Sequence, residues 1–389
     1  MLSSPRFNDF TAYLAAIERF TDEELIPAEP RLETEDCVPE EITQRMRDLG
    51  LFGISIPEEY GGLACTQEEQ VLLTIAFTRA SAVFRSRFST TIGLTSQAIL
   101  DFATEAQKRE WLPRMASGEV TGAFALTEPE AGTDAGGLKT TAVRDGGHYV
   151  LNGMKRYITN APEADLFLVM ARTEAGSTGS RGVSAFLVKA GTPGIEPLPA
   201  PPLLGLRGSH STEIRIQNCR VPAENLVGGV EGRGLNAALR GINSARTHVA
   251  ATCVGQAIRL IAEAVAHARK RQQFGQPIGE FQLVQGMLAE MQADMLAAKA
   301  LVLDVARAFD RAVESGTPLP FPDIAAAKYF GSEMVCRVAD RAVQIMGGAG
   351  YIEDNAITRM YRDVRLFRLF EGTSQIQQQQ IAKAMLRTG

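Results

Sequence analysis

The chain has 389 residues, more than one hydrophobic core usually serves, and this length predicts roughly two to three domains. Hydrophobic residues make up 45% of the chain and charged residues 22%, a composition that excludes wholesale disorder. The 40 Lys and Arg residues against 45 Asp and Glu residues give a net charge of −5 without a basic block, which argues against nucleic acid or an anionic membrane as a partner.

The N-terminus and the cysteines predict where in the cell the protein is found. Pro5, Arg6 and Asp9 interrupt the N-terminus, where a secretory signal would need an apolar stretch. The five cysteines are dispersed, and no pair has the spacing of metal ligands. Both observations predict reduced thiols and a cytoplasmic protein. No apolar run approaches the roughly 18 residues that cross a bilayer, and four histidines without ligand spacing argue against a metal hydrolase.

The first part of the chain has helical apolar spacing. Phe10, Leu14 and Ile17 recur at steps of three and four residues, and similar spacing continues as far as Trp111. We therefore predict an N-terminal all-α domain over residues 1–120.

The middle part changes to short runs rich in β-branched and aromatic residues. Residues 149–151, 166–169 and 185–188 are such runs, and Gly, Asn, Asp and Pro separate them. This spacing predicts an antiparallel β domain over residues 121–230.

The last part is helical again, with longer elements. Apolar residues from Phe281 to Phe309 alternate steps of three and four, which is a period of about 3.5 residues. That period is typical of a helix packed almost antiparallel in a bundle. The sequence thus predicts a C-terminal four-helix bundle over residues 231–389 and a multidomain α+β fold class overall.

The short glycine motifs that bind nucleotides are missing from the sequence. No G-x-G-x-x-G follows a predicted strand, and neither a P-loop nor a G-x-S-x-G motif occurs. A nucleotide-like cofactor would therefore be held by separate loops. The segments with suitable hydroxyl, amide and aromatic side chains are 124–134, 155–160, 271–282 and 370–377.

In the last of these segments, Glu371 lies beside Gly372, just before a predicted helix. Ser374 and Gln377 have the spacing of a capping box at the start of that helix. A carboxylate in such a loop suits a general base. The residues alone leave open the alternative that Glu371 is a solvated loop residue.

Together these segments resemble the acyl-CoA dehydrogenase family over nearly the whole chain. The resemblance rests on the order and spacing of the segments as well as on each motif. The matching segments are 56–62, 111–113, 126–134, 156–160, 206–209, 221–222, 271–282, 344–350 and 371–377. The resemblance implies that helical domain, β domain and bundle form the acyl-CoA dehydrogenase fold.

The resemblance also implies a chemistry. The family uses FAD to oxidise an acyl-CoA thioester to the trans-2-enoyl-CoA, a reaction of fatty-acid β-oxidation. Glu371 matches the base that takes the α-proton, while the β-hydride goes to flavin N5. Relatives that act on branched or very long chains place the base before an arginine in the first bundle helix, where this sequence has Ala245 before Arg246. Glu371 is therefore the expected base.

Residue by residue, the resemblance implies a FAD site shared between subunits. The family usually has tryptophan in place of Tyr157 and serine in place of Thr133. Contacts to the flavin and pyrophosphate would come from Phe124, Leu126, Thr127, Gly132, Thr133, Tyr157, Ile158 and Thr159, and contacts to the adenosine half from Thr373 and Gln375. Contacts to the FAD of a neighbouring subunit would come from Arg271, Gln273, Phe274, Gln282, Gln344 and Gly348. Such a site implies a homo-oligomer, usually a tetramer.

The expected substrate site has a thioester end and a distal end. The residues expected near the thioester are Thr133, Asn243, Arg246, Glu371 and Gly372. Arg85 would line the distal end of the acyl pocket, where glutaryl-CoA dehydrogenases carry a similar aromatic-Arg-Ser that binds the terminal carboxylate. An unpaired arginine in an apolar pocket costs several kcal/mol, so an acid-terminated acyl group would complement it.

Other observations keep alternatives open. Thr78 stands where the glutaryl branch has a glutamate, and the nearby Arg87 is consistent with a solvated basic helix face that would include Arg85. The substrate is then a plain short or branched acyl-CoA, an acid-terminated acyl-CoA that is also decarboxylated, or an acyl group on a carrier protein.

The expected electron acceptor is electron-transfer flavoprotein, with oxygen as the alternative in an oxidase. A non-catalytic flavin-binding member and a desulfinase fit less well, because Glu371 is present.

Overall fold

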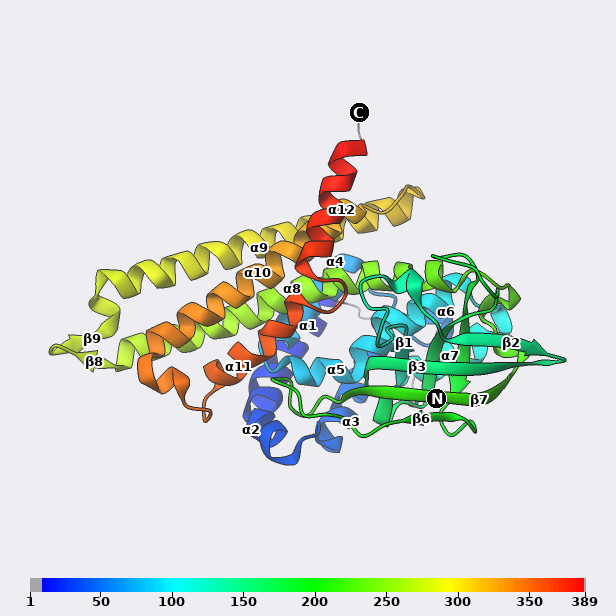
Figure 1. Cartoon of the computed structure of the whole chain (residues 1–389). Coiled ribbons are helices and arrows are strands. Elements are labelled where there is room, and N and C mark those ends of the chain that lie inside the picture. Colours follow the sequence, from blue (N-terminus) through cyan, green and yellow to red (C-terminus); the bar gives the residue numbers. More distant parts are fainter. Residues whose placement is uncertain (1–8, 388–389) are drawn as a thin grey trace.

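The computed structural model describes residues 9–387, so Pro5 and Arg6 lie outside the described residues. In Figure 1 a sheet lies at the right and long helices extend to the left, and the N-terminal helices lie between them and beside the sheet. The order along the chain is therefore helices, sheet and helical bundle, as the sequence predicts.

The N-terminal part consists of short helices around buried aromatic and aliphatic side chains. These helices are α1 (Phe10–Phe20), α2 (Ile26–Glu35), α3 (Glu40–Asp48), α4 (Gln67–Phe77), α5 (Ala82–Thr90), α6 (Ser96–Phe102) and α7 (Glu105–Ala116). Thr66 begins α4 with a capping box, since its hydroxyl accepts from the backbone of Glu69 and the Glu69 carboxylate accepts in return. A π-helical turn, η4 (Thr91–Thr95), joins α5 directly to α6.

The middle part is a curled sheet. Its strands are β1 (Gly122–Ala125), β2 (Thr141–Asp145), β3 (His148–Thr159), β4 (Leu166–Arg172), β5 (Val183–Lys189), β6 (Ile195–Pro197) and β7 (Ser211–Pro222). The prediction of an antiparallel sheet is wrong for β4, which pairs in parallel with both β1 and β2. The remaining pairs, such as β3 with β7 and β4 with β5, are antiparallel.

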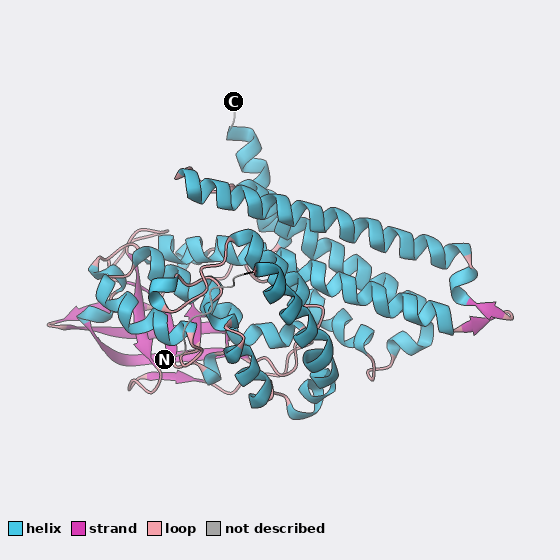
Figure 2. Cartoon of the chain, turned by 180° about the vertical axis from the view of Figure 1, so that it is seen from behind, coloured by secondary structure: helices cyan, strands magenta, loops and turns pink. Residues whose placement is uncertain are grey.

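The C-terminal part is dominated by three long helices that lie side by side in Figures 1 and 2. Its elements are α8 (Gly234–Lys270), β8 (Gln272–Gln273), β9 (Gln276–Pro277), α9 (Gln282–Ser315), α10 (Phe321–Met346), α11 (Ala356–Val364) and α12 (Ser374–Arg387). The 3.5-residue pattern in α9 is confirmed as a buried face, with Met291, Met295 and Val302 all in the core. The small hairpin of β8 and β9 lies at the far end of this bundle.

Helix α8 is the central element of the bundle. It contains an 18-residue window apolar enough to span a membrane by composition, but 67% of that window is buried inside the protein. The close contact with α4 requires a glycine, because a Cβ on Gly255 would lie 2.3 Å from the Thr78 hydroxyl and 2.6 Å from the Ile75 carbonyl oxygen. Gln256 also donates to the carbonyl oxygens of Thr78 and Ala80. We therefore interpret α8 as a core helix.

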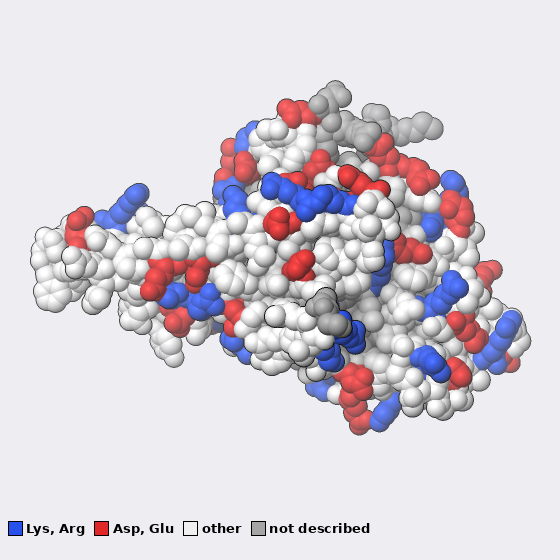
Figure 3. Space-filling model, turned by 90° about the horizontal axis from the view of Figure 1, so that it is seen from above, with Lys and Arg blue, Asp and Glu red and all other residues white. Residues whose placement is uncertain are grey.

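The surface seen in Figure 3 carries interspersed basic and acidic side chains, and the arm formed by the far end of the bundle is mostly uncharged. Exposed apolar residues on that arm include Phe274 and Leu283. Such residues are typical of a surface that another protein chain covers.

Candidate active site

The loop between α11 and α12 places Glu371 in an unusual backbone conformation. Glu371 has φ 53°, and Gly372 follows with φ 89°. A Cβ on Gly372 would lie 2.8 Å from Gln377 Nε2 and 3.1 Å from Arg246 Nη2, so only glycine fits there. Left-handed backbone at a non-glycine residue costs energy and is found where the surrounding structure enforces it, often at functional sites.

Three side chains hold this loop from different helices. Arg246 Nε donates to the Glu371 carbonyl oxygen at 2.9 Å, and Lys328 Nζ donates to the Gly372 carbonyl oxygen at 2.8 Å. Gln377 Nε2 donates to both carbonyl oxygens, at 3.1 and 2.9 Å. Because α8, α10 and α12 each contribute one donor, the bundle fixes the position of Glu371.

The predicted capping box of Ser374 and Gln377 is wrong. The Gln377 side chain is occupied by the Glu371 loop, and the Ser374 hydroxyl donates to Glu333 Oε1 at 2.6 Å. Thr373 takes the capping role instead, because its hydroxyl accepts from the backbone of Ile376 at 3.4 Å.

The charges around Glu371 set its protonation. Burial raises the pKa of Glu371 to about 7, although the positive charges of Arg246, Lys328 and Arg85 oppose this shift. Burial also lowers the pKa of Lys328 to about 8 and that of Arg246 below its ordinary value. A carboxylate that titrates near neutral pH suits a general base. Lys328 was not among the predicted site residues, because in sequence it looks like an ordinary helix-surface lysine, but it is fully buried.

Arg85 is buried, with 9% of its surface exposed, so the interpretation as a solvated helix face is wrong. Its Nε has no hydrogen-bond partner, and Arg85 forms no ion pair with any residue of the described range 9–387. Burial lowers the pKa of Arg85 to about 10, and the attraction of Glu371 counteracts part of this shift. A buried guanidinium without an ion-pair partner is complementary to an anionic ligand.

The two predicted flavin segments are brought together by a buried ion pair. Lys155 Nζ lies 2.7 Å from Glu128 Oε1 and donates to the Leu126 carbonyl oxygen at 3.1 Å. The backbone of Arg156 donates to the Thr127 carbonyl oxygen at 2.8 Å. Leu126, Thr127 and Glu128 of one segment are therefore fixed against Lys155 and Arg156 of the other. Phe124 belongs to the first segment, and Tyr157, Ile158 and Thr159 belong to the second.

These two segments have the properties that FAD would need. Tyr157 is 64% exposed in a left-handed conformation at a bulge of β3, and the Arg156 guanidinium lies over its ring. A Cβ on Gly132 would meet nothing within 4 Å, and the backbone N–H groups of residues 132–134 donate to no described acceptor. Free backbone donors in an open loop suit a phosphate, and an exposed aromatic edge suits a flat ring.

Helix α5 and η4 connect the sheet to the buried arginine. Asn160, at the end of β3, donates to the Ser86 carbonyl oxygen at 2.7 Å and to the Thr90 hydroxyl at 3.0 Å. The Thr90 hydroxyl in turn donates to the Gly122 carbonyl oxygen at 2.8 Å. The position of Arg85 is therefore tied to the strands that carry the flavin segments.

The other predicted site residues fall into two groups. Thr373 and Gln375 adjoin Glu371, and Asn243 Oδ1 accepts from Arg246 Nη1 at 2.6 Å. The second group lies at the far end of the bundle, exposed and away from this centre, and comprises Arg271, Gln273, Phe274, Gln282, Gln344 and Gly348. Within one chain these residues do not join the site.

A buried carboxyl group that titrates near neutral pH, a surface for a flat cofactor and a helix–sheet–bundle architecture are consistent with an oxidoreductase that acts on acyl thioesters. Residues 8–119, 123–219 and 232–386 match the N-terminal, middle and C-terminal domains of acyl-CoA dehydrogenases. The chain belongs to the acyl-CoA dehydrogenase family, and the predicted fold class is confirmed.

Several relatives show the range of this family. An acyl-CoA dehydrogenase of Bacillus subtilis is 38% identical over 95% of this chain and 96% of its own length. The caffeyl-CoA reductase–Etf complex subunit CarC of Acetobacterium woodii is 37% identical over 90% of each chain. Among solved structures, butyryl-CoA dehydrogenase of Megasphaera elsdenii is 33% identical with a TM-score of 0.91, covering 98% of this chain and 99% of that one. A glutaryl-CoA dehydrogenase of Mycobacterium smegmatis in complex with FADH2 is 29% identical with a TM-score of 0.89, covering 97% and 95%.

Proposed function

We propose that this protein oxidises an acyl-CoA thioester to the trans-2-enoyl-CoA, with Glu371 as the base that removes the α-proton. The observation that carries this proposal is the Glu371 carboxyl group, whose pKa is raised to about 7 in a loop fixed by Arg246, Lys328 and Gln377. FAD, bound along residues 124–133 and 157–159, would supply the acceptor for the β-hydride.

The loop backbone supports the same reaction. The N–H group of Glu371 donates to no described acceptor, so it is available to the thioester oxygen. A hydrogen bond there would stabilise the negative charge that develops on that oxygen as the α-proton leaves. The nearby charges of Arg246 and Lys328 would favour the same enolate-like charge and keep part of the Glu371 population ionised at neutral pH.

The surroundings of this reaction are also part of the proposal. The exposed residues at the far end of the bundle support a homo-oligomer, proposed to be a tetramer, in which they reach a neighbouring FAD. The relative named as part of an Etf complex supports electron-transfer flavoprotein as the acceptor. The cytoplasmic location and a role in fatty-acid β-oxidation stay predictions from the sequence.

The first test is Glu371→Gln. This variant keeps the shape of the side chain but cannot take a proton, so kcat should fall by about 100-fold or more while FAD stays bound. The measurement is anaerobic bleaching of the flavin absorbance by butyryl-, octanoyl-, isobutyryl- and glutaryl-CoA. Near-normal bleaching by the variant would exclude Glu371 as the base.

The buried Arg85 favours an acid-terminated acyl-CoA as the substrate. Its guanidinium has no anionic partner in the described chain, and one of the similar structures is a glutaryl-CoA dehydrogenase. We expect Arg85→Gln to raise KM for glutaryl-CoA by about tenfold or more and to change KM for butyryl-CoA little. Arg87→Gln, two residues along α5, is the matched control. Equal effects of Arg85→Gln on both thioesters would favour a plain acyl chain.

A further inference from the structure

A second buried side chain carries an unpaired nitrogen atom and lies within reach of the Arg85 charge. His248, on α8, is 1% exposed, and its Nδ1 has no hydrogen-bond partner. A Cβ on Gly93 of η4 would lie 3.5 Å from this nitrogen, so glycine leaves room beside it. The charge of Arg85 acts on His248 across this region. Two unsatisfied nitrogen atoms of different side chains are therefore buried and electrostatically coupled, and native proteins rarely leave such atoms without a hydrogen-bond partner.

The hydrogen bonds of Gln70 determine which nitrogen of His248 carries its proton. Gln70 Nε2 donates to the Cys65 carbonyl oxygen at 2.8 Å, so its Oε1 is left to face His248 Nε2 at 3.0 Å. An amide oxygen can only accept, and Nε2 must therefore be the donor. In a neutral imidazole, Nδ1 is then a bare acceptor.

We propose that His248 and Arg85 together bind the terminal carboxylate of an acid-terminated acyl thioester, and that His248 takes up one proton at Nδ1 when this substrate enters. The proposal rests on the proposed function, since it concerns the far end of the same acyl pocket. A bare Nδ1 would repel a carboxylate oxygen, whereas a protonated Nδ1 donates a charge-assisted hydrogen bond to it. The proton comes from solvent, and the carboxylate stays ionised.

The surroundings of His248 explain why the proton arrives only with the substrate. Burial and the charge of Arg85 lower the pKa of His248 to about 3 in the free protein. The elements packed around it offer no compensating anion: α4 presents the neutral amide of Gln70, η4 presents Gly93, and Glu371 acts on Arg85. A bound carboxylate would supply that anion and raise the pKa of His248.

The test measures proton uptake by calorimetry. FAD-loaded Glu371→Gln protein is titrated with glutaryl-CoA and with butyryl-CoA in two buffers that differ in ionisation enthalpy. This background prevents turnover and removes the titration of Glu371 itself. We expect glutaryl-CoA to take up about one proton more than butyryl-CoA, and its Kd to rise by up to about tenfold per pH unit as the pH increases.

Two variants in the same background locate the proton. His248→Gln cannot be protonated, so it should abolish the extra uptake and weaken glutaryl-CoA binding about tenfold or more, with butyryl-CoA binding and FAD content unchanged. Gly93→Ala keeps His248 but fills the space beside Nδ1, and it should weaken glutaryl-CoA selectively as well.

The outcomes separate this proposal from the proposed function. Equal proton counts for both thioesters, or an extra proton that persists in His248→Gln, would overturn the role of His248. If butyryl-CoA bleaches the wild-type flavin while glutaryl-CoA fails to bind, the acid site is refuted and the dehydrogenase function stands. Binding of neither thioester would refute both.

Discussion

Glu371 has a pKa that burial and neighbouring cations move in opposite directions. Burial raises this pKa from its ordinary value of 4.5 to about 7, and Arg246, Lys328 and Arg85 keep it from rising further. Only the carboxylate can accept the α-proton, so kcat/KM should rise as the pH increases through about 7. The pH at which kcat/KM rises, the rising limb of the pH profile, then reports the charge around Glu371.

Substitution of Lys328 tests that electrostatic balance. Lys328→Met and Lys328→Gln both remove the charge, which should move the rising limb of kcat/KM for butyryl-CoA to higher pH. Lys328→Gln can still donate to the Gly372 carbonyl oxygen, so it should retain a higher kcat than Lys328→Met. The pKa of Lys328 is itself about 8, so Lys328 loses its charge above that pH. The difference in kcat/KM between the wild type and the variants should then shrink. A limb at the wild-type pH in both variants would limit Lys328 to a structural role.

At the scale of elements, the contact between α4 and α8 depends on small residues. Gly255 lets the backbone of α8 approach Thr78 and Ile75 closely, while Gly331 of α10 faces Ala250 of α8 at an ordinary distance of 3.4 Å. Both glycines lie within helices, but only Gly255 lacks room for a methyl group. Helix spacing, more than helix propensity, therefore makes Gly255 necessary.

The two glycines form a matched pair for measurement. Gly255→Ala should destabilise the protein by about 1–3 kcal/mol, because the new Cβ would overlap backbone atoms of α4. Gly331→Ala should be neutral or stabilise by up to about 1 kcal/mol through its helix propensity. Thermal unfolding of both variants checks this expectation, which equal losses of stability would contradict.

Local patterns predicted these elements better than long-range ones. The buried face of α9 follows from a 3.5-residue period, a property of the helix itself. The parallel pairing of β1 with β4 was missed, because nothing in a strand's own sequence specifies its partner. The burial of Arg85 and Lys328 likewise depends on elements far away in the chain, so the sequence left Arg85 open and gave no reason to select Lys328.

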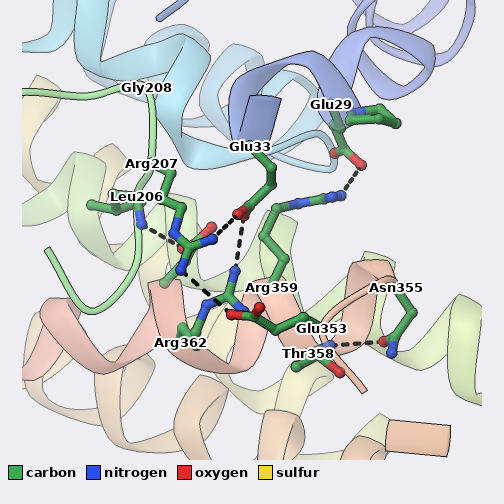
Figure 4. A network of polar contacts seen from close by, with 12 residues as sticks. Glu29, Glu33, Leu206, Arg207, Gly208, Glu353, Asn355, Thr358, Arg359 and Arg362 are labelled. Atoms are coloured by element: carbon green, nitrogen blue, oxygen red, sulfur yellow. Dashed lines mark hydrogen bonds and ion pairs between the residues drawn. The ribbon is translucent and has the colours of Figure 1, made fainter. Parts of the chain in front are cut away.

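At the scale of the whole molecule, ion pairs join the N-terminal helices to the bundle (Figure 4). Glu29 of α2 pairs with Arg359 of α11, and Arg259 of α8 lies 3.7 Å away. Glu33 Oε1 pairs with Arg362 Nη2 at 2.9 Å, and Glu33 Oε2 pairs with Arg207 Nη1 at 2.8 Å. The network therefore connects α2, α8, α11 and the loop before β7, which are distant in sequence.

Arg359→Met should destabilise the protein in a pH-dependent way. Burial already raises the pKa of Glu29, and Arg359 opposes this shift. Without Arg359 the folded state would hold a proton on Glu29 more tightly than the unfolded state does, so stability should fall as the pH rises above the ordinary pKa of 4.5. Well above that pKa the loss should be about 3–5 kcal/mol, because a buried charge loses its nearer partner and keeps only Arg259 at 3.7 Å.

The control is Arg220→Met, which breaks an exposed pair with Asp145. Exposed pairs contribute little, so the melting temperature should change only slightly at every pH. A loss in Arg359→Met that does not vary with pH would point to packing alone.

The burial of α8 has a consequence for synthesis on the ribosome. Residues 234–270 emerge before α9 and α10, which both pack along this helix in the finished protein. Until residue 346 has left the exit tunnel, only earlier elements such as α4, η4 and α6 can shield its apolar side chains. We expect the nascent chain to be most prone to aggregation, and most dependent on chaperones, during this interval of translation.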